Sequence, residues 1–203
     1  MKFFEFYLRP SAFICGLIIL LSLDIFAQNV PSPKSVLGFE PTSDKTIADW
    51  RQITDYFTRL DAASDKITVQ EIGKTTLGKP LVVVFISSVE NIKNLENYKR
   101  TNQKLADPRK IKDQVELEKL IGAGKTIVAI SCSIHSTEIV ASQMSMNLAY
   151  QMATASDDET KEILNNTILL LIPSANPDGI DIVANWYRKT LGTRFEGTSP
   201  PEL

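Results

Sequence analysis

The hydrophobic pattern in the first half of the chain changes from a helical period to a strand period. Apolar residues recur every three or four positions over 46–61, which predicts an amphipathic helix. Residues 67–72 alternate between apolar and polar types, and residues 81–87 are almost continuously apolar. With the turn-like segment 73–80 between them, these two runs predict a hairpin whose second strand is buried on both faces.

The second half of the chain has a strand, helix and strand pattern. Segments 126–131 and 167–172 are short apolar runs rich in β-branched residues and Leu, and they predict two buried strands. Between them, apolar residues step by four positions from Val140 to Met152 and predict a helix that packs this face into the core. Because this order favours a parallel crossover, we expect an α/β/α sandwich around a mixed sheet. Further helices are expected near 95–106, 115–121 and 157–164.

The two ends of this pattern define the expected domains. Basic residues precede an apolar run of about a dozen residues, shorter than the roughly 20 of a spanning helix, and Ala27 offers a small-residue cleavage point. We therefore expect a signal peptide over 1–27, export to the periplasm or the extracellular space, and no stable membrane span afterwards. Residues 28–45 carry several Pro residues among Ser, Thr and Gly and predict an exposed linker before a domain over 46–203.

Composition narrows the classes of function. The 22 Lys and Arg residues against 24 Asp and Glu give a net charge of −2, which leaves no basic surface for nucleic acid. An apolar content of 43% favours a packed domain over a disordered chain. The sequence holds one His, so this chain alone cannot supply the two or three imidazoles of most catalytic zinc sites.

The first candidate site is the segment 131–138, where an apolar strand ends and a long helix begins. Sheets of α/β proteins place their ligands beyond the carboxyl ends of their strands. His135 and Glu138 lie three positions apart, and across such a turn they could reach one metal ion. The alternative is an ordinary capped helix start, in which Glu138 serves only the helix dipole.

Two other segments are candidates. Asn176, Pro177, Asp178 and Gly179 follow the last strand directly, and their residue types are also those of an ordinary turn. Arg188 lies about ten positions further on, in Trp-Tyr-Arg-Lys-Thr, and an Arg-Lys pair is usually part of a solvated face. Each signal is weak by itself.

The order of the three motifs resembles the zinc carboxypeptidase family, the metallopeptidases of carboxypeptidase A and B type. His-x-x-Glu comes first, Asn-Pro-Asp-Gly follows about 40 residues later, and Tyr-Arg-Lys-Thr comes after that. Upstream, the segment 71–81 is similar to the first hairpin of the family, with a Gly-Lys-Thr turn and a Gly-Lys-Pro strand start. The resemblance covers roughly residues 46–198.

The resemblance implies a role for each matching residue. His135 and Glu138 correspond to the first two ligands of one Zn²⁺ ion, and Arg188 corresponds to the arginine that polarises the scissile carbonyl and binds the oxyanion. Residues 176–179 correspond to a turn that shapes the wall of the site. The implied reaction is hydrolysis of a peptide or protein substrate by a zinc-activated water, with a carboxylate as general base.

In the family, a third ligand (a His), a substrate-binding Asn-Arg pair and the general-base Glu lie beyond the position of Leu203. The resemblance therefore predicts an N-terminal fragment of a metallocarboxypeptidase that is inactive by itself. Two alternatives stay open. One is a zinc-dependent deacylase or amidohydrolase of small N-acyl amino acids, and the other is an exported, non-catalytic module that binds peptides.

Overall fold

The computed structural model describes residues 29–201, so the predicted signal peptide over 1–27 lies outside the described residues. The helices and strands follow one another as α2 (Pro33–Leu37), α3 (Trp50–Ala63), β1 (Ile67–Lys74), β2 (Pro80–Ile86), α4 (Val89–Lys93), α5 (Leu95–Leu105), a 3₁₀ turn (Pro108–Lys110), α6 (Gln114–Ala123), β3 (Thr126–Ser131), α7 (Ile139–Thr154), α8 (Asp158–Asn166), β4 (Thr167–Ile172) and α9 (Pro177–Thr190). Over these residues, no helix is long and apolar enough to cross a membrane.

The four strands form one mixed sheet in the order β1-β2-β4-β3. Strands β1 and β2 pair antiparallel, as the predicted hairpin requires, and β4 pairs antiparallel with β2. Strands β3 and β4 are parallel and are joined through α7 and α8, which confirms the predicted crossover. The carboxyl ends of β3 and β4 therefore lie together, and the segments that follow them become neighbours.

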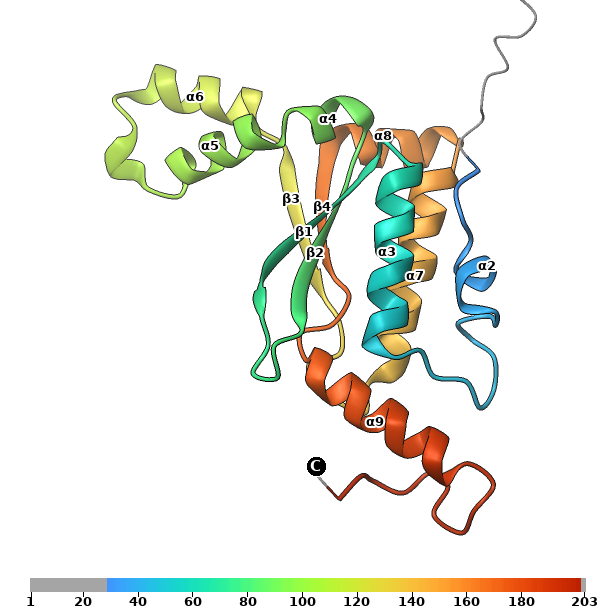
Figure 1. Cartoon of the computed structure of the whole chain (residues 1–203). Coiled ribbons are helices and arrows are strands. Elements are labelled where there is room, and N and C mark those ends of the chain that lie inside the picture. The colour runs from blue at the N-terminus through green and yellow to red at the C-terminus, as the bar shows by residue number, and fades with distance from the viewer. Residues whose placement is uncertain (1–28, 202–203) are drawn as a thin grey trace, which may run out of the picture.

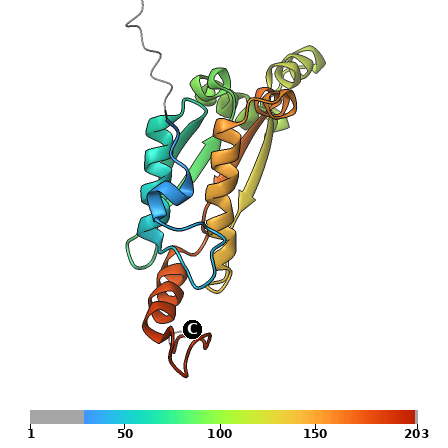
Figure 2. The ribbon, with the colours of Figure 1, turned by 90° about the vertical axis from the view of Figure 1, so that its right-hand side faces the viewer.

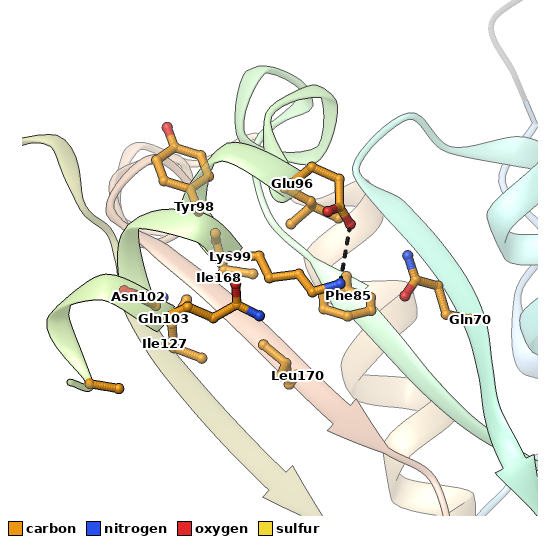
Figure 3. Close-up of a pocket in the computed structure, with 12 residues that line it drawn as sticks. Gln70, Phe85, Glu96, Tyr98, Lys99, Asn102, Gln103, Ile127, Ile168 and Leu170 are labelled. Carbon is orange, nitrogen blue, oxygen red and sulfur yellow. Dashed lines mark ion pairs between the residues drawn. The ribbon is translucent and has the colours of Figure 1, made fainter. Parts of the chain in front are cut away.

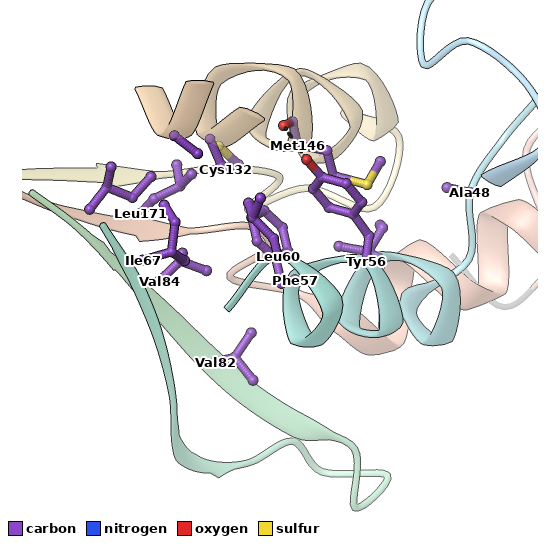
Figure 4. Packing of buried hydrophobic residues seen from close by; sticks show 14 of the residues in the cluster. Ala48, Tyr56, Phe57, Leu60, Ile67, Val82, Val84, Cys132, Met146 and Leu171 are labelled. Carbon is purple, nitrogen blue, oxygen red and sulfur yellow. Dashed lines mark hydrogen bonds between the residues drawn. The ribbon is translucent and has the colours of Figure 1, made fainter. Parts of the chain in front are cut away.

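One face of the sheet is covered by α3 and α7, which run side by side (Figures 1 and 2). Phe57 and Leu60 of α3 are fully buried against Val84, Met146 and Leu171 from β2, α7 and β4 (Figure 4). Burying each such side chain contributes about 1.5–3 kcal/mol, so this layer dominates the stability of the fold. Helix α5 lies near one end of the opposite face, and the α/β class with a mixed sheet is confirmed.

Helix α3 begins four residues later than its periodicity predicts. The Asp49 carboxylate accepts the amide of Gln52 at 2.8 Å, and the Gln52 side chain accepts the amide of Asp49 at 3.1 Å, which is a capping box. The amide of Trp50 donates to Asp181 of α9 at 2.7 Å. These bonds use the free N–H groups of the first turn and tie the start of α3 to α9.

The segment 28–45, expected as an exposed linker, contains a helix and buried residues. Ser32 caps α2, Pro33 occupies its first turn and Gly38 ends it in the left-handed conformation. Leu37 is buried in the same cluster as α3. Ser32 and Pro33, two of the residues that suggested an exposed linker, are the start signals of a short helix.

Two burial predictions are wrong. Strand β3 was expected to be buried, but Ile127 and Val128 are 40% and 41% exposed, because β3 lies at the edge of the sheet over the described residues. In α7, Val140 is 67% exposed. The buried face of α7 carries small and polar residues instead, together with Met146. A search for hydrophobic periodicity does not detect the polar residues of this buried face.

Candidate metal centre

The turn between β3 and α7 brings His135 and Glu138 into direct contact. The ring atom Nδ1 of His135 lies 2.9 Å from Oε1 of Glu138. The amide of His135 donates to the other carboxylate oxygen, Oε2, at 3.0 Å. Both side chains are accessible, with 76% of the imidazole and 45% of the carboxylate side chain exposed. The predicted pair is therefore placed together on the surface, just beyond the carboxyl end of β3.

The electrostatics of this turn keep the carboxylate ionised. The hydrogen bond with the His135 ring, joined by the bond from the His135 amide, holds the pKa of Glu138 below its ordinary value. Glu138 is also the N-cap residue of α7, yet its side chain makes no capping bond to the helix. The Glu138 carboxylate turns back to His135 and does not bond to the first turn of α7.

The two donor groups fit one zinc ion in part. Imidazole nitrogen and carboxylate oxygen are both zinc ligands at about 2.0–2.2 Å, so two ligands of one ion lie at most about 4 Å apart. The 2.9 Å between Nδ1 of His135 and Oε1 of Glu138 satisfies that limit. Across residues 29–201, no cluster of three or more His, Cys, Asp or Glu residues could hold a metal ion. The chain thus offers two donors.

The segment 176–179 is the start of a helix, which corrects its interpretation as a turn. The Asn176 side chain accepts the amide of Gly179 at 3.0 Å, and Pro177 occupies the first turn of α9. Asn is a favoured N-cap and Pro a favoured first residue of a helix, so the residue types that are typical of a turn are also typical of a helix start. The apolar positions that follow continue with helical spacing.

Residues 176–179 pack directly against the His135–Glu138 turn. A Cβ atom on Gly179 would lie 2.3 Å from Oγ of Ser136, so only glycine permits this approach. The Asn176 amide group also reaches Oγ of Ser136, at 3.4 Å. The N-terminus of α9 therefore forms one wall beside the two donors.

Asp178 connects this wall to the β1–β2 hairpin. Its carboxylate accepts the hydroxyl of Thr75 at 2.8 Å and the amide of Leu77 at 3.1 Å. Lys79 forms ion pairs with Asp178 and Asp181, one helical turn apart on α9. The hairpin and α9 are thus fixed to each other by half-buried charges.

Arg188 lies in the last turn of α9 and is held by the start of α3. Its guanidinium donates to Asp49 at 2.9 Å, to the carbonyl of Ile47 at 2.8 Å and to Gln52 at 2.9 Å. Burial raises the pKa of Asp49, but the bonds from the Gln52 amide and from Arg188 outweigh this and hold the pKa below its usual value. No hydrogen bond or ion pair between described residues joins Arg188 to His135 or Glu138.

Four buried serines lie in or near the two strand-to-helix turns, and the sequence pattern did not predict them. Ser133, Ser142, Ser145 and Ser174 are each at most 3% exposed, and they come from the β3–α7 turn, from α7 and from the β4–α9 turn. Ser133 has φ 49, a conformation that non-glycine residues rarely adopt. Serine carries no hydrophobic signal, so only the paired polar positions on one face of α7 could have revealed them.

Two cavities lie near the ends of the sheet. One, of about 550 Å³, is bounded by Thr137 and Val140 of the α7 start and by Tyr187 of α9. The other, of about 440 Å³, lies between α5 and the sheet and is lined by Phe85 and Leu170, among others (Figure 3). None of the predicted site residues lines either of these two cavities, although Thr137, between the two donors in sequence, lines the first. Arg188 lines a third cavity, of about 380 Å³, together with Asp49 and Gln52.

His135 and Glu138 thus lie in contact just beyond the carboxyl end of β3, one strand of the parallel pair β3 and β4 in a mixed α/β sheet. The sequence profile of the zinc carboxypeptidase family matches residues 53–198. The chain belongs to the zinc carboxypeptidase family, which confirms the resemblance drawn from its motifs.

Solved structures that superpose in part on this chain include thrombin-activatable fibrinolysis inhibitor, with 15% identity, a TM-score of 0.49, and coverage of 74% of this chain and 31% of that one. Carboxypeptidase A from Helicoverpa armigera superposes with 17% identity, a TM-score of 0.47, and coverage of 79% of this chain. The chain spans 31% and 32% of the lengths of these two structures. No curated protein matches it in sequence.

Proposed function

We propose that this chain forms the N-terminal part of a zinc metallocarboxypeptidase domain and that His135 and Glu138 are two of its zinc ligands. The observation that carries the proposal is the 2.9 Å contact between an exposed imidazole and an ionised carboxylate at the end of β3. A zinc ion bound there supplies a Lewis acid that polarises a peptide carbonyl and activates a water molecule. A complete catalytic zinc site needs a third protein ligand and a general base in addition to these two donors, and no cluster of three or more His, Cys, Asp or Glu residues within 29–201 supplies them.

The chain's own residues orient the two donors. The His135 amide holds Oε2 of Glu138, which leaves Oε1 directed at the imidazole. Gly179 and Asn176 limit the movement of Ser136, between the two donors in sequence. The cavity lined by Thr137 and Val140 offers a peptide substrate a largely apolar surface at the start of α7.

Arg188 is proposed to bind the scissile carbonyl and to stabilise its developing negative charge. The guanidinium is 43% exposed, so it is accessible from solvent. Its present partners are Asp49, Gln52 and a backbone carbonyl, and binding substrate requires it to exchange at least one of them. The role therefore includes a movement of the side chain.

Zinc titration of the chain, prepared without a polyhistidine tag, tests the ligand assignment. The sequence holds one His, so the imidazole signals in a nuclear magnetic resonance (NMR) spectrum belong to His135 alone. We expect Zn²⁺ to shift these signals with weak affinity. In isothermal titration calorimetry, which does not need the imidazole signal, we expect His135→Ala and Glu138→Gln each to weaken zinc binding at least about tenfold. Glu159→Gln, an exposed carboxylate in the first turn of α8, is the matched control and should leave binding unchanged.

A zinc affinity that is the same in His135→Ala as in the wild-type chain would contradict the assignment. We also expect no hydrolysis of peptide substrates by this chain alone, because two donors leave the ion weakly held. Stoichiometric zinc after dialysis, with release of C-terminal residues from peptides, would show that the chain is a complete enzyme and would overturn the proposed division of the domain.

A further inference from the structure

We infer that Ser133 and Ser142 are positioning residues that hold the His135–Glu138 turn in the conformation that presents both donors, an inference that rests on the zinc function proposed above. The two hydroxyls lie beneath the exposed turn and touch neither donor group. They act through the backbone of Glu138 and through the unusual conformation of Ser133.

The first observation is the strained backbone at Ser133. Its φ of 49 places it in the left-handed region, where Gly is the usual residue and Ser is uncommon. Such conformations persist only where the surrounding structure enforces them, and they gather at functional sites. Ser133 lies two residues after the end of β3, in the turn that leads to His135.

The second observation is what holds Ser133 in that conformation. Its hydroxyl donates to the carbonyl of Glu138 at 2.6 Å and so closes the turn over five residues. The Ser142 hydroxyl lies 2.8 Å from Oγ of Ser133 and 2.7 Å from the carbonyl of Pro173, and can donate to either. Ser142 therefore ties the turn to the end of β4.

The third observation is that this network is buried and reaches the neighbouring turn. Ser133 and Ser142 are 3% and 1% exposed, so water cannot replace their bonds. The Ser174 hydroxyl points to the carbonyl of Ser133 at 3.4 Å and accepts the amide of Asn176 at 3.0 Å. Both strand ends are thus joined under the donors by hydroxyl groups.

A purely structural role predicts a different result from a positioning role. Ser145 is equally buried on the same face of α7, but its hydroxyl donates to the carbonyl of Ser142 within the helix and does not reach the turn. Removing this hydroxyl changes the helix alone. Ser145→Ala is therefore the matched control for Ser142→Ala.

The test combines substitutions with two measurements made on the full chain. Ser133→Gly keeps access to the left-handed conformation and removes the hydroxyl, while Ser142→Ala removes the second hydroxyl. The first measurement, without metal, is the exchange rate of the His135 amide, whose bond to Glu138 depends on the turn, together with the ¹⁵N shift of His135 Nδ1. The second is the Zn²⁺ affinity from the shift of the imidazole signals.

We expect both substitutions to speed exchange of the His135 amide, to move the Nδ1 signal, and to weaken zinc binding about tenfold, as is common for residues that orient metal ligands. Ser145→Ala should change none of these. Unchanged exchange and an unchanged Nδ1 signal in Ser133→Gly and Ser142→Ala would overturn the inference. If Ser142→Ala does not fold, Ser133→Gly decides alone, because it relieves strain rather than adding it.

The two proposals fail separately. If the wild-type chain does not bind zinc but the two substitutions still release the His135 amide, the positioning role stands and the zinc assignment is wrong. If zinc binds through His135 and Glu138 but the substitutions change neither measurement, the zinc assignment stands and the positioning role is wrong.

Discussion

The two strand-to-helix turns that follow β3 and β4 lie in contact, but they are built in different ways. The turn after β4 uses Asn176 as an N-cap with a side-chain bond to the helix, and Pro177 in the first turn. The turn after β3 passes through the left-handed Ser133 and ends at Glu138, whose side chain makes no bond to its own helix. One turn satisfies the local rules of helix initiation, and the other does not.

The turn after β4 therefore contributes mainly to stability, while the turn after β3 gives up some stability to place the side chains of His135 and Glu138. An N-cap bond stabilises a helix by about 1 kcal/mol, and α7 gives up that bond because the Glu138 carboxylate is directed to His135. Departures of this kind are expected at functional sites, where local preferences are overridden by the surrounding structure. The turn after β4 supplies the support: Gly179 packs against Ser136, and Asp178 anchors the hairpin.

The largest expected effect comes from adding a methyl group at the point where the two turns pack most closely. Gly179→Ala places a Cβ atom 2.3 Å from Oγ of Ser136, so the turns must separate, and we expect a loss of about 1–3 kcal/mol in the free energy of unfolding. Chemical denaturation measures this loss. Gly122→Ala in α6 is the control, because a Cβ there meets nothing within 4 Å and helix propensity favours Ala. Equal stability of the two variants would show that the contact is not tight.

The next effect distinguishes a capped from an uncapped helix start. Asn176→Ala removes the bond to the Gly179 amide, and we expect a loss of about 1 kcal/mol in the free energy of unfolding. Glu138→Ala removes no capping bond and should leave thermal stability nearly unchanged while it abolishes the contact with His135. Thermal melts of the two variants, measured side by side, check the contrast. A larger loss for Glu138→Ala would mean that Glu138 does cap α7.

A smaller effect is expected at the other end of α9. Arg188→Gln removes the ion pair with Asp49, and because the guanidinium is 43% exposed, we expect less than about 1 kcal/mol of destabilisation. In an active enzyme that contains this domain, the same substitution should lower kcat far more than it lowers stability, since the proposed role is in the transition state. If the loss in kcat, expressed as a free energy, is no larger than the loss in stability, Arg188 acts only as a structural connection between α9 and α3.

The smallest effect is a dependence on pH that only one of the turns should show. The folded-state pKa of Glu138 is lowered, so its contact with His135 stabilises the turn fully above the ordinary carboxyl pKa of about 4.3 and is lost as the pH falls through the lower folded-state value. The protection of the His135 amide, which is its exchange rate compared with the intrinsic rate at the same pH, should fall over that acid range. The Gly179 amide, bonded to the uncharged Asn176, should not respond, and Glu138→Gln should remove the response.

Sequence reasoning recovered the hairpin, the parallel crossover and the contact of His135 with Glu138, because each depends on local period or on short spacing. It missed α9, because Asn-Pro and Asp-Gly are turn signals and helix-start signals at once, and the helical spacing after them decides between the two. It placed the core on the wrong face of α7, because the buried face holds Ser142 and Ser145. Buried polar residues are paired with partners distant in sequence, and a hydrophobic pattern does not reveal these.

The amino-acid sequence by itself determined the hairpin, the strand, helix and strand crossover, the family, and the close placement of His135 and Glu138, since these follow from residue types at fixed spacing. The tertiary structure alone decided that Arg188 is held by Asp49, that Gly179 meets Ser136, and that hydroxyl groups join the ends of β3 and β4. The physical reason is that the partners in these contacts lie far apart in the sequence. Hydrogen bonds and close contacts between residues about 30 to 140 positions apart depend on how the layers pack, and no local pattern in the chain encodes their geometry.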